Sequence, residues 1–333
     1  MLKVLFAGTP ETAVPSLRKL AHDTDHFEIV AVLTRPDAPT GRGRKLQPSA
    51  VKQAALELGL PVIESDPKEE TFVDELAATG AQIGVVVAYG NILRQHVLDA
   101  LPMGWVNLHF SLLPEWRGAA PVQRAIWAGD SVTGTTVFQL TRGMDEGPVL
   151  AQSTMEIRAH DTSGELLERL AQDGSHLLAA ALEALAEGRI SPVPQPQGSF
   201  EVARKITTED AAVRFKAPVF AVDRQIRACT PAPGAWAHLH ANAVAEDADA
   251  VEGKEAPAAT VLHILKAVPA DTEDMQVPDD LEPGKLVVTK KHVWVGTLTS
   301  PLELLAVKPQ GKKAMAAADW ARGAHLDETA YLD

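Results

Sequence analysis

The sequence predicts an α/β protein, with a mainly parallel, Rossmann-like sheet in the first part of the chain and a small barrel of short strands in the second. Strand-like runs alternate with helical runs over about the first 190 residues, which is typical of parallel sheets with crossover helices. The run IGVVVA at 83–88 is apolar throughout, as in a central strand covered on both faces. Several short strand-like runs follow residue 230, and they favour a barrel.

The first strand and the first helix are expected at residues 2–6 and 11–20. Thr9 suits the N-cap of that helix, and Pro10 suits its first position. A strand, a glycine turn and a helix open many nucleotide-binding folds. Here, however, the turn lacks the Gly-x-Gly-x-x-Gly pattern that lets a pyrophosphate approach the backbone. We therefore disfavour a dinucleotide cofactor.

The remaining elements of the first part follow from periodicity and capping signals. Thr162 and Glu165 form a capping box, which marks a helix N-terminus. The long amphipathic helix that they open ends at Gly188, where glycine suits a C-terminal cap. Further strands are predicted at 28–34, 83–88, 134–141 and 149–157, and further helices at 50–58, 69–78 and 120–128.

The domain boundary is expected close to residue 200. Residues 190–200 contain three prolines, a glycine and little periodicity, which is typical of a linker. We expect a catalytic domain at 1–189, a linker at 190–203 and a second domain at 204–333. Within the second domain a helix is expected at 210–228, and short strands are expected around Trp236, Val261, Leu286 and Val293.

The composition is that of a globular protein, with 333 residues, 46% hydrophobic content, a formal net charge of -13 and a pI of about 5.3. An acidic body restricts any nucleic-acid site to a local basic patch. Cys229 is the only cysteine, which excludes an intrachain disulfide and a multi-cysteine zinc site. No cleavable signal pattern and no apolar run of roughly 20 residues is found. We expect a cytoplasmic protein without a membrane partner.

The segment NLHFSLLPEWRG lies at the end of a predicted strand, and the chain is organised around it. Alternation along a strand places Asn107, His109 and Ser111 on one face and Leu108 and Phe110 on the other. An asparagine can donate a hydrogen bond to a developing oxyanion, and a histidine can move a proton near neutral pH. The segment therefore predicts a reaction centre, although such a pair alone is often only a satisfied polar strand end.

A second polar segment, GMDEGP at 143–148, lies in a turn between two predicted strands. A carboxylate in this turn could orient the imidazole and favour its charged form. The two segments together favour catalysis. The histidine and the carboxylates lack a recognisable metal-ligand spacing, so no metal is expected.

The pattern Asn-x-His-x-Ser-Leu-Leu-Pro-x-x-Arg-Gly at 107–118, followed by Asp-x-Gly at 145–147, resembles the signature of folate-dependent formyltransferases. The run RGAAPVQRAI at 117–126 narrows the resemblance to the branch of the family that acts on methionyl-tRNA. Matching pieces at 204–210, 226–236 and 309–320 extend the resemblance over nearly the whole chain.

The resemblance implies that 10-formyltetrahydrofolate, as a cosubstrate, gives its formyl group to the α-amino group of methionine on initiator tRNA. Asn107 and His109 are expected to stabilise the oxyanion, and His109 is also expected to move the proton. Asp145 is expected to orient His109 directly or through water. The residues expected to hold the folate are Ser111, Leu112, Leu113, Pro114, Ala88, Tyr89 and Gly90.

The connection at 35–45, RPDAPTGRGRK, is long, basic and rich in glycine. Residue types alone favour a mobile, solvated loop without a partner, whereas the resemblance implies an insertion that enters the acceptor end of tRNA. It also implies that the second domain is an oligonucleotide-binding (OB) barrel and helps to hold tRNA. The residues expected to contact tRNA are Arg42, Arg44, Lys45, Arg204, Lys205 and Lys312, with Lys290, Lys291 and Lys313 on the same face.

Two acidic stretches, 244–255 and 269–282, are expected to be solvated insertions that face away from the RNA, because they would repel phosphate. The protein is expected to act as a monomer. Three alternatives remain open: formyl transfer to a different acceptor, such as a nucleotide sugar, a purine intermediate or water; a noncatalytic RNA-binding module; and, least favoured, a nicotinamide dehydrogenase.

Overall fold

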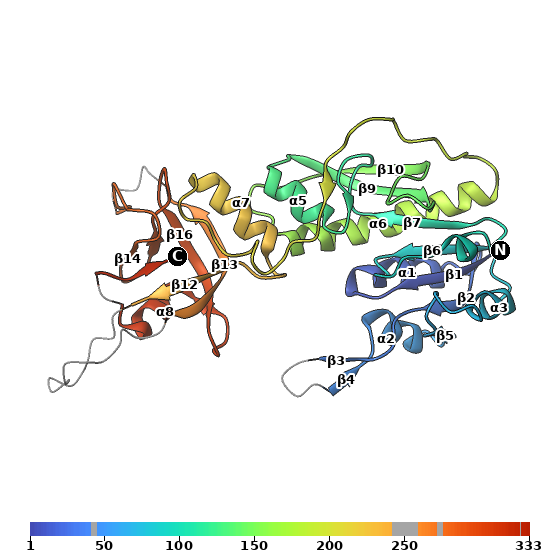
Figure 1. Ribbon diagram of the computed structural model, residues 1–333, viewed down its shortest axis with the longest axis horizontal. Coiled ribbons are helices and arrows are strands. Elements are labelled where there is room, and N and C mark those ends of the chain that lie inside the picture. The colour runs from blue at the N-terminus through green and yellow to red at the C-terminus, as the bar shows by residue number, and fades with distance from the viewer. Residues whose placement is uncertain (41–44, 242–258, 272–275, 327) are drawn as a thin grey trace. The chain divides into compact units, whose positions relative to one another are not determined.

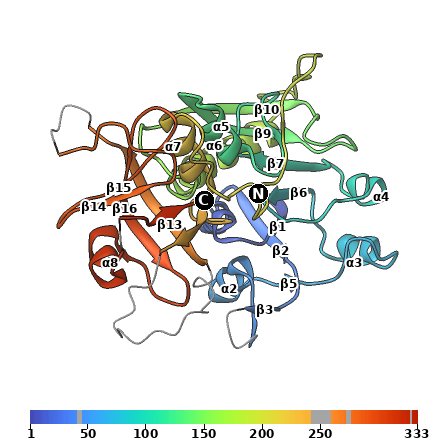
Figure 2. The same ribbon diagram turned by 60° about the vertical axis from the view of Figure 1, so that its left-hand side comes forward.

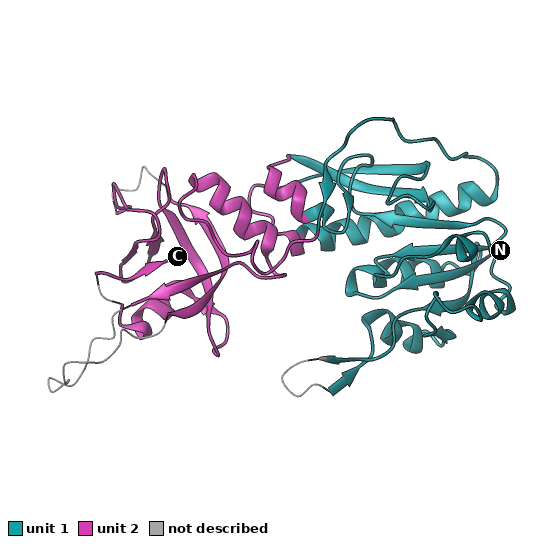
Figure 3. Cartoon of the chain, in the orientation of Figure 1, with its two compact units in different colours: residues 1–122, 131–157, 166–204 teal, residues 123–130, 158–165, 205–333 magenta. Residues whose placement is uncertain are grey.

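The computed structural model describes residues 1–40, 45–241, 259–271, 276–326 and 328–333. The chain forms two compact units, which Figure 3 shows in different colours. Unit 1 contains residues 1–122, 131–157 and 166–204, and unit 2 contains residues 123–130, 158–165 and 205–333.

Unit 1 is built on a seven-stranded sheet in the order β10-β9-β7-β6-β1-β2-β5 (Figure 1). The five strands from β5 to β7 are parallel, and β9 and β10 are antiparallel to their neighbours. The predicted, mainly parallel sheet is confirmed. Its strands are β1 Leu2–Gly8, β2 Phe27–Leu33, β5 Val62–Ile63, β6 Ile83–Val87, β7 Trp105–His109, β9 Val132–Gln139 and β10 Val149–Glu156.

Two small sheets accompany this large one. Strands β3 Ala38–Thr40 and β4 Lys45–Gln47 pair with each other, so the expected basic loop leaves and rejoins the fold as a hairpin. Strands β8 Arg117–Gly118 and β11 Val202–Ala203 pair in parallel. The helical segments up to residue 190 are η1 Glu11–Ala13, α1 Val14–His22, α2 Ala50–Glu57, α3 Phe72–Ala78, α4 Gln95–Leu98, α5 Pro121–Ala128 and α6 Ser163–Ala186.

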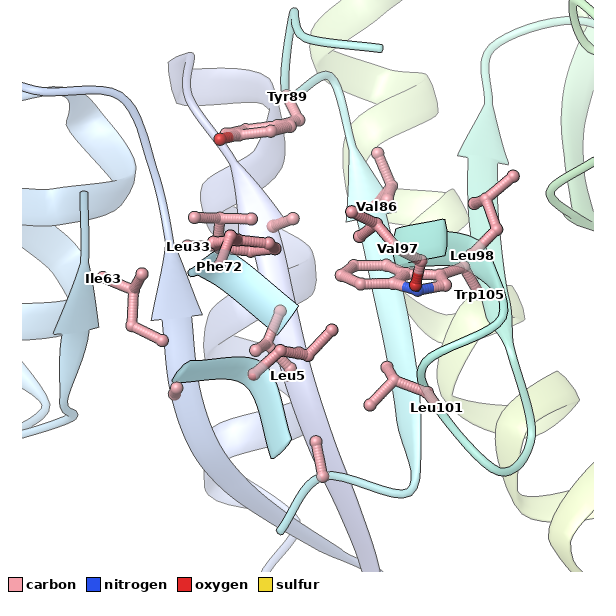
Figure 4. Packing of buried hydrophobic residues seen from close by; sticks show 14 residues of the cluster. Leu5, Leu33, Ile63, Phe72, Val86, Tyr89, Val97, Leu98, Leu101 and Trp105 are labelled. Carbon is pink, nitrogen blue, oxygen red and sulfur yellow. The ribbon is translucent and has the colours of Figure 1, made fainter. Parts of the chain in front are cut away.

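One face of the large sheet packs against α3 and α4. Phe72 of α3 and Val97 of α4 join Leu5, Leu33 and Trp105 of the sheet in one buried cluster (Figure 4). The Trp105 ring covers Gly84 so closely that a Cβ on Gly84 would lie 2.1 Å from the indole. The glycine is therefore required by packing.

Helix α6 packs against the sheet through a glycine. A Cβ built on Gly174 would lie 3.0 Å from Leu108 of β7, so the helix backbone approaches the strand closely. The side chain of Leu108 therefore points toward α6, away from its neighbours Asn107 and His109. Alternation along the strand therefore places Leu108 as expected, whereas β7 ends at His109, before Phe110 and Ser111.

The two capping predictions have different outcomes. The Thr162–Glu165 box is formed, because the Glu165 carboxylate accepts from the Thr162 backbone N–H at 2.9 Å. The prediction for Thr9 and Pro10 is wrong. Pro10 precedes the 3-10 turn η1, α1 begins only at Val14, and the Thr9 hydroxyl donates to the Tyr89 carbonyl at 2.8 Å.

Unit 2 contains a second sheet in the order β14-β15-β16-β13-β12-β18, with β17 paired to β16. Figure 2 labels its strands β13 to β16. Backbone hydrogen bonds from Leu286 to Ala330 and from Leu332 to Gly284 link its two outer strands. The sheet is therefore nearly closed, and the predicted barrel is confirmed. Its strands are β12 Trp236–His240, β13 Thr260–Pro269, β14 Leu286–Val288, β15 Val293–Val295, β16 Leu302–Pro309, β17 Met315–Ala316 and β18 Tyr331–Leu332.

Helix α7 Val219–Cys229 contacts β13, and α8 Ala317–Ala324 contacts β16. The prediction of a helix over 210–228 is wrong for residues 210–218, because α7 begins only at Val219. The backbone N–H of Trp236 in β12 donates to the Ala211 carbonyl, and the backbone N–H of Val213 donates to the Trp236 carbonyl. This extended pairing takes the place of the predicted helical turns.

Two acidic stretches were expected to be solvated insertions, and much of each lies outside the described residues: all of 244–255, and positions 272–275 of the stretch at 269–282. In the part of the chain that the structure describes, every helix is too short or too polar to cross a membrane.

Candidate active site

The end of β7 carries the two side chains that begin the predicted reaction centre. Strand β7 pairs with β6 on one side and β9 on the other, so Asn107 and His109 lie in the middle of the sheet. His109 is buried and meets the Phe138 ring edge-on, with 6.4 Å between ring centroids. The site therefore forms at the carboxyl ends of parallel strands, where α/β sheets bind ligands.

The turn between β9 and β10 brings a carboxylate to this strand end. Asp145 Oδ2 lies 3.8 Å from His109 Nδ1 and accepts a hydrogen bond from the Gly118 backbone N–H at 2.8 Å. The backbone of Asp145 has a φ of 53°, in the left-handed region that L-residues with a side chain rarely adopt. A Cβ on Gly147 would lie 1.7 Å from the Gln139 carbonyl oxygen, so the turn requires glycine there.

The second nitrogen of His109 is held by the backbone. Its Nε2 lies 3.0 Å from the carbonyl oxygen of Trp116. A carbonyl oxygen can only accept, so the proton of the neutral ring sits on Nε2 and Nδ1 faces Asp145 with a lone pair. Burial lowers the pKa of His109, and the nearby Asp145 carboxylate opposes this shift. The lowered pKa favours a neutral imidazole with a basic Nδ1 at neutral pH.

These groups open into a cavity of about 370 Å³ in unit 1. Its walls combine apolar residues with the three polar side chains expected to be catalytic. The lining residues are Val86, Ala88, Tyr89, Gly90, Asn91, Asn107, Leu108, His109, Phe110, Gly118, Ala119, Pro121 and Asp145. The structure thus brings the predicted catalytic trio together with three of the seven predicted folate residues.

The other four predicted folate residues follow β7 but do not line this cavity. They are Ser111, Leu112, Leu113 and Pro114. Their backbone is held by two polar side chains from the neighbouring strands. Thr136 of β9 accepts from the Leu113 N–H at 3.1 Å and donates to the Ser111 carbonyl at 2.7 Å. Gln152 of β10 donates to the Leu113 carbonyl at 2.9 Å.

Sequence reasoning missed Thr136 and Gln152, because an alternating strand pattern does not reveal which polar side chain meets which loop. It also missed Gln195, whose amide contacts both the Asp145 turn and Arg117. A glutamine between prolines carries no motif that could have singled it out.

The predicted tRNA residues lie in several parts of the chain. Arg42 and Arg44 lie outside the described residues, and Lys45 begins β4 with an exposed side chain. Arg204 belongs to unit 1, and Lys205 and Lys312 belong to unit 2.

The base of the β3–β4 hairpin is held by an ion triad. Lys52 Nζ lies 2.6 Å from Asp37 Oδ1 and 2.9 Å from Glu64 Oε2. Asp37 directly precedes β3, so the triad fixes the point at which the basic hairpin leaves the sheet. Among the residues that the structure describes, no three His, Cys, Asp or Glu side chains are grouped to hold a metal ion.

Family models match both parts of the chain. The model described as "Formyl transferase" matches residues 2–182, and the model described as "Formyl transferase, C-terminal domain" matches residues 205–325. The chain therefore belongs to the formyl transferase family, and the family expected from the sequence motifs is confirmed.

Relatives that match this chain over nearly its whole length are named methionyl-tRNA formyltransferases. The chain is 71% identical over 327 residues to the methionyl-tRNA formyltransferase of Bifidobacterium adolescentis, covering 98% of each chain. It is 49% identical over 327 residues to the methionyl-tRNA formyltransferase of Mycobacterium ulcerans, again covering 98% of each chain.

Two solved structures share the fold at low sequence identity. An N-formyltransferase from Helicobacter canadensis, solved with folinic acid and dTDP-3-aminofucose, gives a TM-score of 0.60 at 16% identity and covers 91% of this chain and 99% of its own. HypX from Aquifex aeolicus, solved with tetrahydrofolic acid, gives a TM-score of 0.60 at 15% identity. This match covers 96% of the present chain and 46% of HypX.

Proposed function

We propose that this enzyme transfers a formyl group to the α-amino group of methionine on methionyl-tRNA, with 10-formyltetrahydrofolate as the donor. The observation that carries the proposal is the clustering of Asn107, His109 and Asp145 at one cavity in a chain 71% identical, over nearly its full length, to a methionyl-tRNA formyltransferase. The initiator form of the tRNA is the acceptor, because the formylated methionine serves to start translation.

The cavity suits a folate donor in its chemistry. Ala88, Tyr89 and Gly90 line it together with the apolar residues Val86, Leu108 and Phe110. A flat heteroaromatic ring with polar edges is held by apolar walls and backbone hydrogen-bond groups. When bound, the donor supplies an activated formyl group.

Each of the three polar residues has a separate role in acyl transfer to an amine. The side-chain amide of Asn107 donates a hydrogen bond to the formyl oxygen as negative charge develops there. Nδ1 of His109 accepts the proton that the attacking amine releases, and the charged imidazole later returns a proton to the departing nitrogen. Asp145 stabilises the imidazolium from 3.8 Å, which lowers the cost of charging a buried ring.

The domains have different roles in this proposal. We assign residues 1–189 to catalysis, 190–203 to the linker and 204–333 to an OB-like domain that binds tRNA. Lys45 and its neighbours Arg42 and Arg44 contact phosphates or bases near the acceptor end of the tRNA. The phosphate backbone of the tRNA is contacted by Arg204, Lys205 and Lys312. The supporting observation is the hairpin at 38–47, which carries an exposed lysine on an otherwise acidic protein.

The function is tested by measuring formyl transfer from 10-formyltetrahydrofolate to methionyl-initiator tRNA, with methionyl-elongator tRNA and an amino sugar nucleotide as alternative acceptors. Transfer to the initiator tRNA alone supports the proposal. Transfer to the sugar nucleotide but to neither tRNA contradicts it, and would keep the chemistry with a different acceptor.

A further inference from the structure

The segment 193–203, which we call the strap, belongs to unit 1 and is fixed at both ends. At its start, Val193 and Val149 exchange backbone hydrogen bonds of 2.7 and 2.8 Å. At its end, β11 pairs with β8, where Ala203 lies opposite Gly118. A Cβ on Gly118 would lie 2.8 Å from the Ala203 carbonyl oxygen, so the strap and the loop after β7 are in direct contact.

Between these two anchors, the side-chain amide of Gln195 makes four hydrogen bonds. Its Oε1 accepts from Arg117 Nε at 3.1 Å and from Arg117 Nη2 at 2.6 Å. Its Nε2 donates to the Asp145 carbonyl at 2.8 Å and to the Gly147 carbonyl at 2.8 Å. Guanidinium groups only donate and carbonyl groups only accept, so the orientation of the amide is fixed by its partners. All its donors and both its lone pairs are used.

Gln195 thereby joins the two segments that hold His109. Arg117 follows Trp116, whose carbonyl accepts from His109 Nε2. The turn on the other side carries Asp145, whose carboxylate lies beside His109 Nδ1. Arg117 is itself held over the ring of Phe200 in the strap, 5.4 Å from its centroid. A shift of either segment changes the environment of the imidazole.

Each of the two segments that Gln195 joins contains a residue with an unfavourable backbone conformation. Trp116 has a φ of 57° and Asp145 a φ of 53°, and neither is glycine. Such conformations persist where surrounding contacts hold them. The bonds from Gln195 to the carbonyl groups of Asp145 and Gly147 are contacts of this kind.

We propose that Gln195 is a positioning residue for the formyl-transfer reaction. Its hydrogen bonds connect the turn that contains Asp145 to Arg117, and so they keep the Asp145 carboxylate beside His109. Gln195 does not line the cavity and touches no reacting atom. The inference rests on the proposed function and adds a residue from outside the recognised motif. Catalysis depends on the placement of groups to within about 1 Å, and a misplacement of that size can cost about 10²-fold in rate.

The test compares three variants of the full-length enzyme in the methionyl-tRNA formylation assay. Gln195→Ala removes all four hydrogen bonds. Gln195→Glu keeps acceptors for Arg117 but loses both donations to the Asp145 turn. Gln197→Ala is the matched control, because Gln197 is an exposed glutamine two residues along the same strap.

We expect Gln195→Ala and Gln195→Glu to lower kcat by about 10-fold to 10²-fold, with KM for both substrates within about threefold of the wild type and Gln197→Ala unchanged. The acidic limb of the kcat profile should also move to lower pH in Gln195→Ala. The reason is that Asp145 raises the pKa of His109, and a displaced carboxylate raises it less. Among the described residues, Asp145 supplies the charge acting on His109, and the Trp116 carbonyl is its other polar contact.

Two results would overturn the inference: a Gln195→Glu variant with wild-type kcat, or a Gln195→Ala variant that loses kcat with no change in its pH profile. Thermal unfolding of all variants separates loss of folding from loss of positioning. A wild-type enzyme that transfers no formyl group in the same assay would instead refute the proposed function, so the two failures are distinguishable.

Discussion

His109 donates from Nε2 to the carbonyl oxygen of Trp116 over 3.0 Å, and this bond decides which nitrogen takes part in proton transfer. Because Nε2 is occupied by the backbone, the basic site of the neutral ring is Nδ1, 3.8 Å from Asp145 Oδ2. A proton taken up at Nδ1 is therefore stabilised at once by the carboxylate. Trp116, which supplies this carbonyl, itself has a left-handed backbone with a φ of 57°.

The first prediction concerns pH. Burial lowers the pKa of His109 and Asp145 opposes the shift, so the base form predominates at pH 7 and is lost as the pH falls through the lowered pKa. In Asp145→Asn the opposing charge is gone, the pKa falls further, and the acidic limb of kcat moves to lower pH while kcat itself decreases. Profiles of both enzymes with the same substrates check this, since the substrate amine titrates identically in each. An acidic limb that moves to higher pH would contradict it.

The second prediction concerns the loop that follows β7. Thr136→Val leaves the Leu113 N–H and the Ser111 carbonyl without the partner they have in Thr136, and an unsatisfied buried polar group costs about 1–3 kcal/mol. We expect a lower free energy of unfolding in urea and a higher KM for 10-formyltetrahydrofolate. Thr154→Val, at an exposed position on β10, is the control. Equal effects of the two substitutions would show that the loop does not depend on Thr136.

The third prediction concerns the ion triad at the base of the β3–β4 hairpin. Lys52→Met removes the contacts to Asp37 and Glu64 and frees the point where the hairpin leaves the sheet. KM for the tRNA should rise, and KM for the folate should stay the same. Lys68→Met removes one positive charge from an exposed position of unit 1 and serves as the control. A similar rise in both variants would assign the effect to net charge alone.

The fourth prediction concerns the core. Gly84→Ala places a methyl group 2.1 Å from the Trp105 ring, and overpacking of this kind costs about 1–3 kcal/mol. We expect a lower Tm. Gly323→Ala in α8, where a Cβ meets no atom within 4 Å, should leave Tm unchanged or raise it slightly, because alanine favours a helix over glycine. An unchanged Tm for Gly84→Ala would show that Trp105 can move aside.

Much of the large sheet could be predicted from the sequence, because its strands are apolar runs and its helices carry periodic patterns and caps. The segment at 210–218 shows where this fails. Thr207 and Asp210 exchange hydrogen bonds as in a helical capping box, but the buried residues that follow, Ala211, Val213 and Phe215, recur every two positions. That period belongs to an extended chain, and β12 pairs with it.

The site could be predicted only where its residues lie in recognisable segments. Asn107 and His109 share a strand, and Asp145 lies in a conspicuous turn, so their meeting at one cavity follows from the order of the strands. Gln195 is 50 residues from Asp145 in sequence and is brought to it by the strap. No local pattern encodes such a contact, because it depends on the path that an irregular segment takes in three dimensions.

The most direct test of the account is the single-turnover rate of formyl transfer to methionyl-initiator tRNA by Asn107→Ala, with folate and tRNA affinities measured on the same protein. If Asn107 donates to the developing oxyanion, the rate falls by about 10² to 10³ and both affinities stay at their wild-type values. A rate close to that of the wild type, with both affinities unchanged, would show that the oxyanion is stabilised elsewhere.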